Sequence, residues 1–131
     1  MKFGYTIIYV ADVEATVAFY EEAFGLKCRF VHESKLYAEM DTGATALAFA
    51  GDEMAGMNGL SVRPNRPDSQ SSAWEVCFIT DDVDAIYQRA IDAQAIAVSA
   101  PQQKPWGQTV AYVKDINGCL VELATPINHQ A

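Results

Sequence analysis

Short apolar runs alternate with turn residues along the whole chain, and this pattern predicts eight strands. Val, Ile, Phe and Tyr dominate the runs, and Gly, Asp, Asn or Pro bound them. The expected strands are 5–10, 28–32, 36–40 and 45–50 in the first half, and 74–80, 96–99, 109–113 and 119–124 in the second. The sequence DING at 115–118 predicts a hairpin turn, because Asn-Gly suits a backbone with positive φ.

Two other stretches repeat their apolar residues every three to four positions and predict one amphipathic helix in each half. In the first, Asp12 can cap the helix by accepting a backbone N–H bond, and Gly25 can end it. Asp81 or Asp82 can cap the second. The stripes expected to face the core are Val13, Val17, Tyr20 and Phe24 in the first helix, and Val83, Ile86, Tyr87 and Ala90 in the second.

The two halves read as copies of one β-α-β-β-β unit. When residues 5–26 are aligned with residues 75–96, a strand, an Asp and a helix coincide in both. Near the end of each copy, Ala48 aligns with Glu122. The connector between the two copies, residues 51–73, has no clear helical or strand period, so we expect a lid, an interface loop or a disordered linker there. The predicted organisation is one domain, 1–131, made of module one (1–50), a connector (51–73), module two (74–126) and a tail (127–131).

Length and charge narrow the classes of function. A chain of 131 residues can bury a core of its own, and none of its apolar runs is long enough to span a bilayer. The net charge of -8 disfavours nucleic acid and anionic membranes as partners. That charge is compatible with a cationic ligand, or with solubility alone. Cys28, Cys77 and Cys119 lack metal-ligand spacing, so we expect a cytoplasmic protein with buried, reduced thiols.

Alternation along the strands separates an apolar face from a mixed one. The large residues expected under the helices are Ile8, Val10, Leu47, Phe49, Val76, Phe78, Val121 and Leu123. The mixed face holds Glu75 and Glu122 inside otherwise apolar strands. A carboxylate in such a place costs several kcal/mol unless it is solvated, paired or bound to a ligand. Water at a strand end could explain either Glu alone, but we expect the two close enough to share one ligand or one proton.

Other candidate residues give weaker signals. Trp106 lies between Pro105 and Gly107, a bend that either aims its ring into a cleft or packs it under a loop. His32 is expected at the surface and His129 in a solvated tail. The methionines of the connector could form a soft lid over an apolar ligand, although an interface or disorder would suit them as well; they are Met54 and Met57.

Three segments together resemble the vicinal oxygen chelate superfamily, which includes glyoxalase I, bleomycin- and fosfomycin-resistance proteins and extradiol dioxygenases. They are IIYVADVEATVAFYEEAFGL, FITDDVDA and PWGQTVAYVKDINGCLVEL. The resemblance covers nearly the whole chain. It implies an α+β fold, with two tandem βαβββ modules forming a half-open, U-shaped mixed sheet around a ligand groove. Many members of the superfamily are dimers, so the resemblance also implies a homodimer.

Metal-using members take their ligands from the first and last strands of each module. Carried over by position, these places are Tyr5, Ala48, Glu75 and Glu122. Ala48 has no donor atom and the phenol of Tyr5 would have to ionise, whereas a catalytic divalent site normally needs about three protein ligands. The resemblance is therefore closer to the members that bind drugs without a metal.

Three hypotheses follow for the function. The first is a metal-free, cofactor-free binding protein that sequesters a cationic or aromatic compound, as in antibiotic resistance. Its ligand-binding residues would be Tyr5, Tyr9, Ala48, Glu75, Trp106 and Glu122, with the aromatic rings stacking and the two Glu anchoring polar groups. The second is a metal-dependent lyase, isomerase or dioxygenase with Glu75 and Glu122 as ligands. The third is an inactive interaction module.

Overall fold

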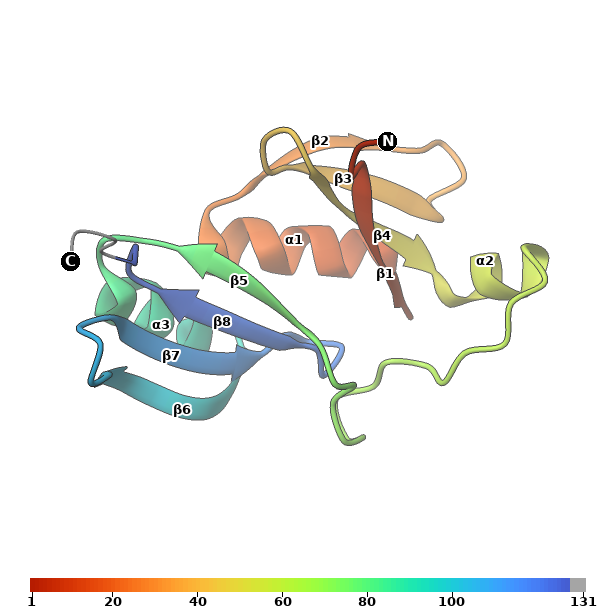
Figure 1. The fold of residues 1–131 in the computed structure, drawn as a ribbon. Coiled ribbons are helices and arrows are strands. Elements are labelled where there is room, and N and C mark those ends of the chain that lie inside the picture. The colour runs from red at the N-terminus through yellow and green to blue at the C-terminus, as the bar shows by residue number, and fades with distance from the viewer. Residues whose placement is uncertain (128–131) are drawn as a thin grey trace. The chain divides into compact units, whose positions relative to one another are not determined.

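The chain divides into two compact units, Met1–Arg66 and Pro67–Ala131. A computed structural model describes residues 1–127 and shows one mixed sheet and one long helix in each unit (Figure 1). The boundary between the units falls inside the expected 51–73 connector. Both units have the predicted β-α-β-β-β order, which confirms the α+β class and the tandem modules, and neither sheet closes on itself. A single domain embracing both units stays a prediction.

The first unit is a four-stranded sheet in the order β1-β4-β3-β2. Its elements are β1 (Tyr5–Val10), α1 (Val13–Phe24), β2 (Lys27–Val31), β3 (Tyr37–Asp41), β4 (Ala46–Gly51) and α2 (Asp52–Met57). The outer strand β1 runs parallel to β4, and the other neighbours are antiparallel. The helix α2 was not predicted, because six residues give too short a stretch to reveal a helical period.

The second unit repeats this topology in the order β5-β8-β7-β6. Its elements are β5 (Glu75–Ile79), α3 (Val83–Asp92), β6 (Ile96–Gln103), β7 (Thr109–Lys114) and β8 (Leu120–Ala124). The strand β6 runs beyond its predicted end at residue 99. It is an edge strand with two shifts of register, and such a strand tolerates Pro101, which has no backbone N–H to donate.

The two long helices, α1 and α3, begin at expected capping residues, and α1 ends at the expected glycine. Asp12 accepts a hydrogen bond from the Ala15 backbone N–H at 3.0 Å, and Gly25 ends α1 in the left-handed conformation with φ of 69°. Asp82, rather than Asp81, caps α3 by accepting from the Ala85 N–H at 3.0 Å. The N-caps thus fix the residue at which each helix begins after the strand that precedes it.

The helices cover one face of each sheet: α1 packs on β2, β3 and β4, and α3 packs on β6, β7 and β8. Tyr20 of α1 lies against Phe49 of β4, with ring centroids 4.8 Å apart. Six of the eight predicted core residues are buried, namely Ile8, Val10, Leu47, Phe49, Val121 and Leu123. The prediction was wrong for Val76 and Phe78, which are only half-buried, because they lie on the edge strand β5.

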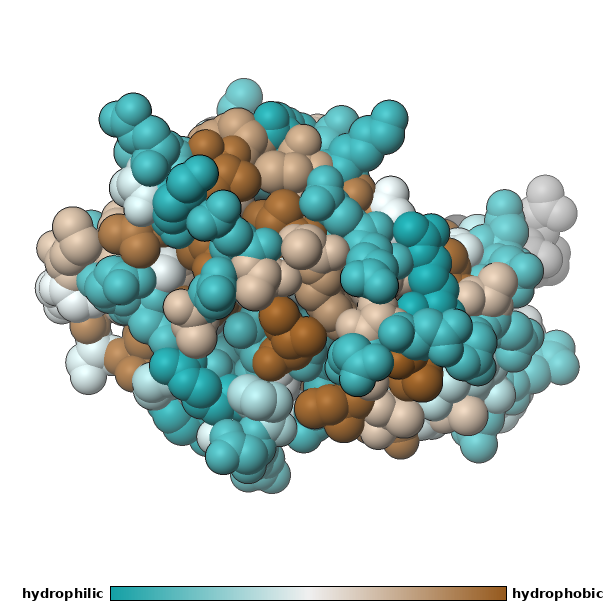
Figure 2. Space-filling model, turned by 180° about the vertical axis from the view of Figure 1, so that it is seen from behind, coloured by the Kyte–Doolittle hydropathy of each residue, from teal (hydrophilic) through white to brown (hydrophobic). Residues whose placement is uncertain are grey.

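The surface is mainly polar on the side that Figure 2 presents, where hydrophobic side chains form separate groups between hydrophilic ones. Within residues 1–127, no helix is both long and apolar enough to cross a membrane. The opposite faces of the two sheets, which the helices leave uncovered, carry the polar clusters described next.

Candidate functional site

Glu75 and Glu122 form a hydrogen-bonded carboxyl pair on the sheet of the second unit. Glu75 begins β5, and Glu122 lies in the parallel neighbour β8, opposite Cys77. The hydrogen bond from Glu122, reinforced by partial burial and by the charge of Glu122, raises the pKa of Glu75 to about 7. The same bond lowers the pKa of Glu122. Below about pH 7 the pair therefore holds one proton, and Glu122 is the member that stays ionised.

Glu122 is also the acceptor for two neighbouring side chains. The Tyr112 hydroxyl donates to its Oε1 at 2.8 Å, and the Cys77 thiol donates to its Oε2 at 3.5 Å. Tyr112 reaches it because the two residues are direct partners in the β7–β8 register. These bonds and the positive charge of Lys104 also lower the pKa of Glu122. Glu122 is thus held as the ionised member of the pair.

The ionised Glu122 keeps both donors protonated. Its hydrogen bond is the main reason that the pKa of Tyr112 rises to about 12. Partial desolvation of its sulfur is the main cause for Cys77, with the Glu122 charge second, and raises that thiol pKa to about 12, although the residue as a whole is exposed. Neither group supplies an anion near neutral pH. The expectation of buried thiols was wrong for Cys77, which is exposed because it lies on the uncovered face, while Cys119 is buried and Cys28 half-buried.

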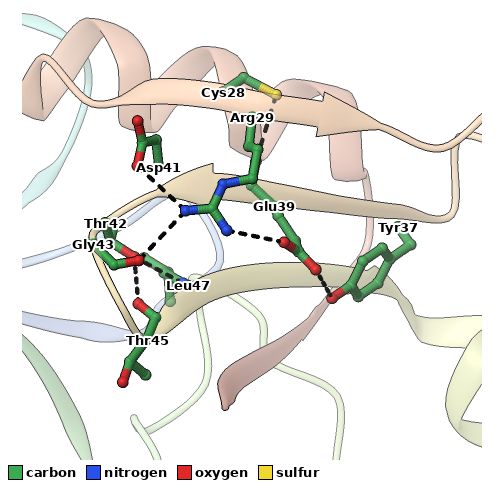
Figure 3. Close-up of polar contacts among 9 residues, drawn as sticks. All are labelled: Cys28, Arg29, Tyr37, Glu39, Asp41, Thr42, Gly43, Thr45 and Leu47. Atoms are coloured by element: carbon green, nitrogen blue, oxygen red, sulfur yellow. Dashed lines mark hydrogen bonds and ion pairs between the residues drawn. The ribbon is translucent and has the colours of Figure 1, made fainter.

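The first unit has its own carboxylate, Glu39, which the sequence reasoning missed. Glu39 lies on β3 directly opposite Ala48 of β4, and only 8% of it is exposed. Figure 3 shows it between two partners: the Tyr37 hydroxyl donates to its Oε2 at 2.8 Å, and Arg29 donates to its Oε1 at 3.4 Å. The family resemblance points only to the first and last strands of each module, whereas Glu39 lies on the strand between them. The alternation Tyr37, Glu39, Asp41 on one face of a strand was the available signal.

The two units neutralise these carboxylates differently. Tyr112 pairs across the strands with Glu122, and at the matching place in the first unit Glu39 pairs with Ala48. Arg29 compensates Glu39 and also donates to Asp41 at 3.3 Å, so the first cluster carries a built-in cation. Burial is the main cause that raises the pKa of Tyr37 to about 12. In the second unit a shared proton takes the place of the guanidinium.

The remaining predicted site residues are divided between the units. Tyr5, Tyr9 and Ala48 belong to the first: 58% of Tyr5 is exposed, Tyr9 is half-buried and Ala48 is fully buried. Trp106 lies in the turn before β7 of the second unit, 66% exposed, and donates to Gln108 at 2.8 Å. Its ring is therefore not packed under a loop, and its N–H bonds Gln108 rather than a carboxyl.

The weaker candidates show no common arrangement. His32 contacts Ser34 in a turn, with its Nδ1 2.8 Å from the serine hydroxyl oxygen. Met54 and Met57 belong to α2, where Met57 is largely exposed. His129 lies outside the described residues.

The donor set of the second unit fits a divalent metal poorly. A metal on Glu122 would have to replace the proton shared with Glu75 and compete with Tyr112 and Cys77 for the same two oxygens. In the part of the chain that the structure describes, no three His, Cys, Asp or Glu side chains are grouped so as to hold a metal ion. Proton exchange and hydrogen bonding are the chemistry that this cluster offers.

Residues 3–128 match the family model of the glyoxalase-like domain. The chain belongs to the glyoxalase-like family. Its place in the vicinal oxygen chelate superfamily, which the sequence motifs indicated, is thereby confirmed. No match was found among curated proteins.

Solved structures with the same fold extend over nearly the whole chain. A glyoxalase-related enzyme from Fulvimarina pelagi has a TM-score of 0.82 at 19% identity, covering 96% of this chain and 88% of its own. A glyoxalase/bleomycin resistance protein/dioxygenase family enzyme from Burkholderia phytofirmans PsJN has a TM-score of 0.76 at 22% identity, covering 95% and 98%. A lactoylglutathione lyase from Agrobacterium tumefaciens has a TM-score of 0.69 at 23% identity, covering 99% and 97%. At these identities the likeness shows the fold alone.

Proposed function

We propose that this glyoxalase-like protein binds a small molecule carrying a protonated amine, and that Glu75 and Glu122 anchor the amine. The observation that supports this most directly is that Glu75 and Glu122 lie on one face of neighbouring strands, where the donors to Glu122 are the neutral groups of Tyr112 and Cys77. An ammonium N–H can replace the proton that the pair holds and donate to Glu122, which lets Glu75 ionise without leaving two carboxylates to repel each other. Charge-assisted hydrogen bonds of this kind are about twice as strong as neutral ones.

Comparison with the first unit favours a cation from outside. Glu39 has the guanidinium of Arg29 at 3.4 Å, whereas the direct donors to Glu122 are the neutral hydroxyl of Tyr112 and the neutral thiol of Cys77. The net charge of -8 also attracts cationic ligands over a distance. The carboxyl pair is thus a partly compensated negative site that a bound ammonium completes.

The aromatic part of the ligand is assigned to an exposed ring. Trp106 of the second unit is 66% exposed, and stacking on such a ring contributes about 0.5–1.5 kcal/mol beyond the buried area. We further propose that the protein sequesters a drug-like amine without a metal or other cofactor, that it acts in the cytoplasm and that it assembles as a homodimer.

One observation favours an enzyme as the second candidate. A carboxyl whose pKa lies near 7 is well placed to give and take a proton, so Glu75 could serve as a general acid–base group in a lyase or isomerase. Measuring the metal content of the purified protein distinguishes a metal-dependent enzyme from the metal-free binding protein. Stoichiometric Zn, Ni, Mn or Fe(II) that survives dialysis, and is lost on Glu75→Gln or Glu122→Gln, would replace the binding proposal with the enzymatic one.

The binding proposal is tested with two probes of equal shape. Calorimetric titration would compare 2-naphthylmethylamine, which is cationic, with neutral 2-naphthylmethanol. We expect the amine to bind more tightly, and Glu122→Gln to weaken it by about tenfold or more, because a hydrogen bond to a charged group is worth about 1.5–3 kcal/mol. Glu33→Gln, the same charge change at an exposed position, is the control and should have little effect. Equal affinity for both probes in wild type would contradict the proposal.

A further inference from the structure

The two carboxyls of the pair have different surroundings, and the difference points to separate roles. The Tyr112 hydroxyl donates to Glu122 at 2.8 Å, and the Cys77 thiol donates to it at 3.5 Å. Each bond to an ionised carboxylate stabilises the charged form, so these two donors favour the negative charge on Glu122.

We infer that Tyr112 is a positioning residue: its hydroxyl, assisted by the Cys77 thiol, fixes the shared proton on Glu75 and leaves Glu122 as the ionised anchor. The inference rests on the proposed function, since it names the carboxyl that meets the ligand cation. Glu122 would receive the ammonium, and Glu75 would release its proton to solvent when the ammonium arrives. A symmetrical pair would instead divide the proton between the two carboxyls.

The sheet explains why Tyr112 can impose this asymmetry. Tyr112 on β7 is the direct cross-strand partner of Glu122 on β8, so its ring stands beside that carboxylate. Glu75 is one pleat away, in the row that it shares with Leu120 and Lys114. The Tyr112 hydroxyl therefore lies next to Glu122 rather than next to Glu75. On the other side of Glu122, its neighbour in β5 is Cys77.

Two lysines also lie near the pair: the charge of Lys104 acts on Glu122, and Lys114 lies in the row of Glu75. Lys104, in the turn before β7, lowers the pKa of Glu122 through its positive charge. Lys114 of β7 shares the row of Glu75. Within residues 1–127, the titratable groups beside the pair are Cys77 on β5, Tyr112 and Lys114 on β7, and Lys104 in the turn. Of the two bonds that Tyr112 and Cys77 donate to Glu122, the bond from Tyr112 is the shorter.

The inference is tested by following the side-chain carboxyl carbons of Glu75 and Glu122 by NMR as the pH is changed, without a ligand. In wild type we expect Glu122 to ionise at lower pH than Glu75. In Tyr112→Phe the ionisation of Glu122 should move up by about one pH unit, because the variant loses one hydrogen bond to the charged form. Tyr37→Phe removes the matching hydroxyl from Glu39 in the first unit and should leave both curves unchanged.

Cys77→Ala gives a second variant, for which we expect a smaller shift of Glu122 in the same direction. The inference would be overturned if Glu75 ionised before Glu122 in wild type, or if Tyr112→Phe left the Glu122 curve in place. Its failure is distinct from that of the proposed function. Absence of binding to 2-naphthylmethylamine would remove the amine ligand, whereas the titration curves report where the proton resides whether or not an amine binds.

Discussion

Replacing Glu75 by Gln should stabilise the protein at alkaline pH and leave its stability almost unchanged at acid pH. The amide N–H of Gln can donate to Glu122 at every pH, whereas the carboxyl of Glu75 can donate only below its pKa, when it is protonated. That pKa is about 7 in the folded chain, against an ordinary value of 4.5. The stability that protonated Glu75 contributes is therefore complete below about pH 4.5 and is lost as the pH rises through 7.

The size of the effect follows from the difference between these two values. A difference of about 2.5 pH units corresponds to about 3 kcal/mol at 1.36 kcal/mol per unit. Glu75 is exposed to solvent, which screens the interaction and lets the ionised side chain move toward water, so we expect about 1 kcal/mol. For a chain of this length that corresponds to about 4 °C in Tm.

The assay is chemical denaturation of wild type and Glu75→Gln from pH 4 to pH 9. The two free energies of unfolding should agree at pH 4 and separate progressively between about pH 4.5 and pH 7.5, with the variant the more stable. Glu33→Gln removes the same charge from an exposed position and corrects for the effect of net charge. A constant difference between wild type and Glu75→Gln at all pH values would refute the shared proton.

Three further predictions concern other parts of the molecule. In a chain with Cys28 and Cys119 changed to Ser, Glu122→Gln should make the alkylation of Cys77 at pH 8 severalfold faster, because loss of the carboxylate charge lowers the thiol pKa. An unchanged rate would mean that desolvation alone protects the thiol. Arg29→Met should lower the free energy of unfolding by about 1–3 kcal/mol, because it leaves the buried Glu39 without its cation. The control Lys35→Met breaks a surface ion pair with Glu14 and should change that free energy by less than about 0.5 kcal/mol, so equal losses would show that Glu39 needs no cation. Light scattering should give twice the chain mass of 14.3 kDa, and a monomer at all accessible concentrations would remove the proposed homodimer.

The sequence predicted the fold well because local signals agreed with the tertiary structure. Asp12 and Gly25 bound α1, and the repeat of strand and helix patterns correctly predicted the topology of both units. It predicted edges less well. Val76 and Phe78 have the residue types of a core strand, but they lie on β5, where a missing neighbour leaves them half-buried.

The site was only half predictable for a similar reason. Strand parity placed Glu75 and Glu122 on one face, and the structure joins them by a hydrogen bond. Parity could not reveal which residues of other strands stand beside them, since cross-strand register depends on turns and bulges. That register brings Tyr112 to Glu122, and it also brings Glu39 to the place opposite Ala48 where no donor had been expected.

The exchange of a proton for an ammonium is tested most directly by counting the protons released on binding. Calorimetric titration with 2-naphthylmethylamine, in two buffers that differ in ionisation enthalpy, measures this number at pH 6 and at pH 8.5. With the pKa of Glu75 at about 7, binding should release about one proton at pH 6 and almost none at pH 8.5, where the affinity should be higher. Binding with the same affinity and no proton release at both pH values would contradict the account.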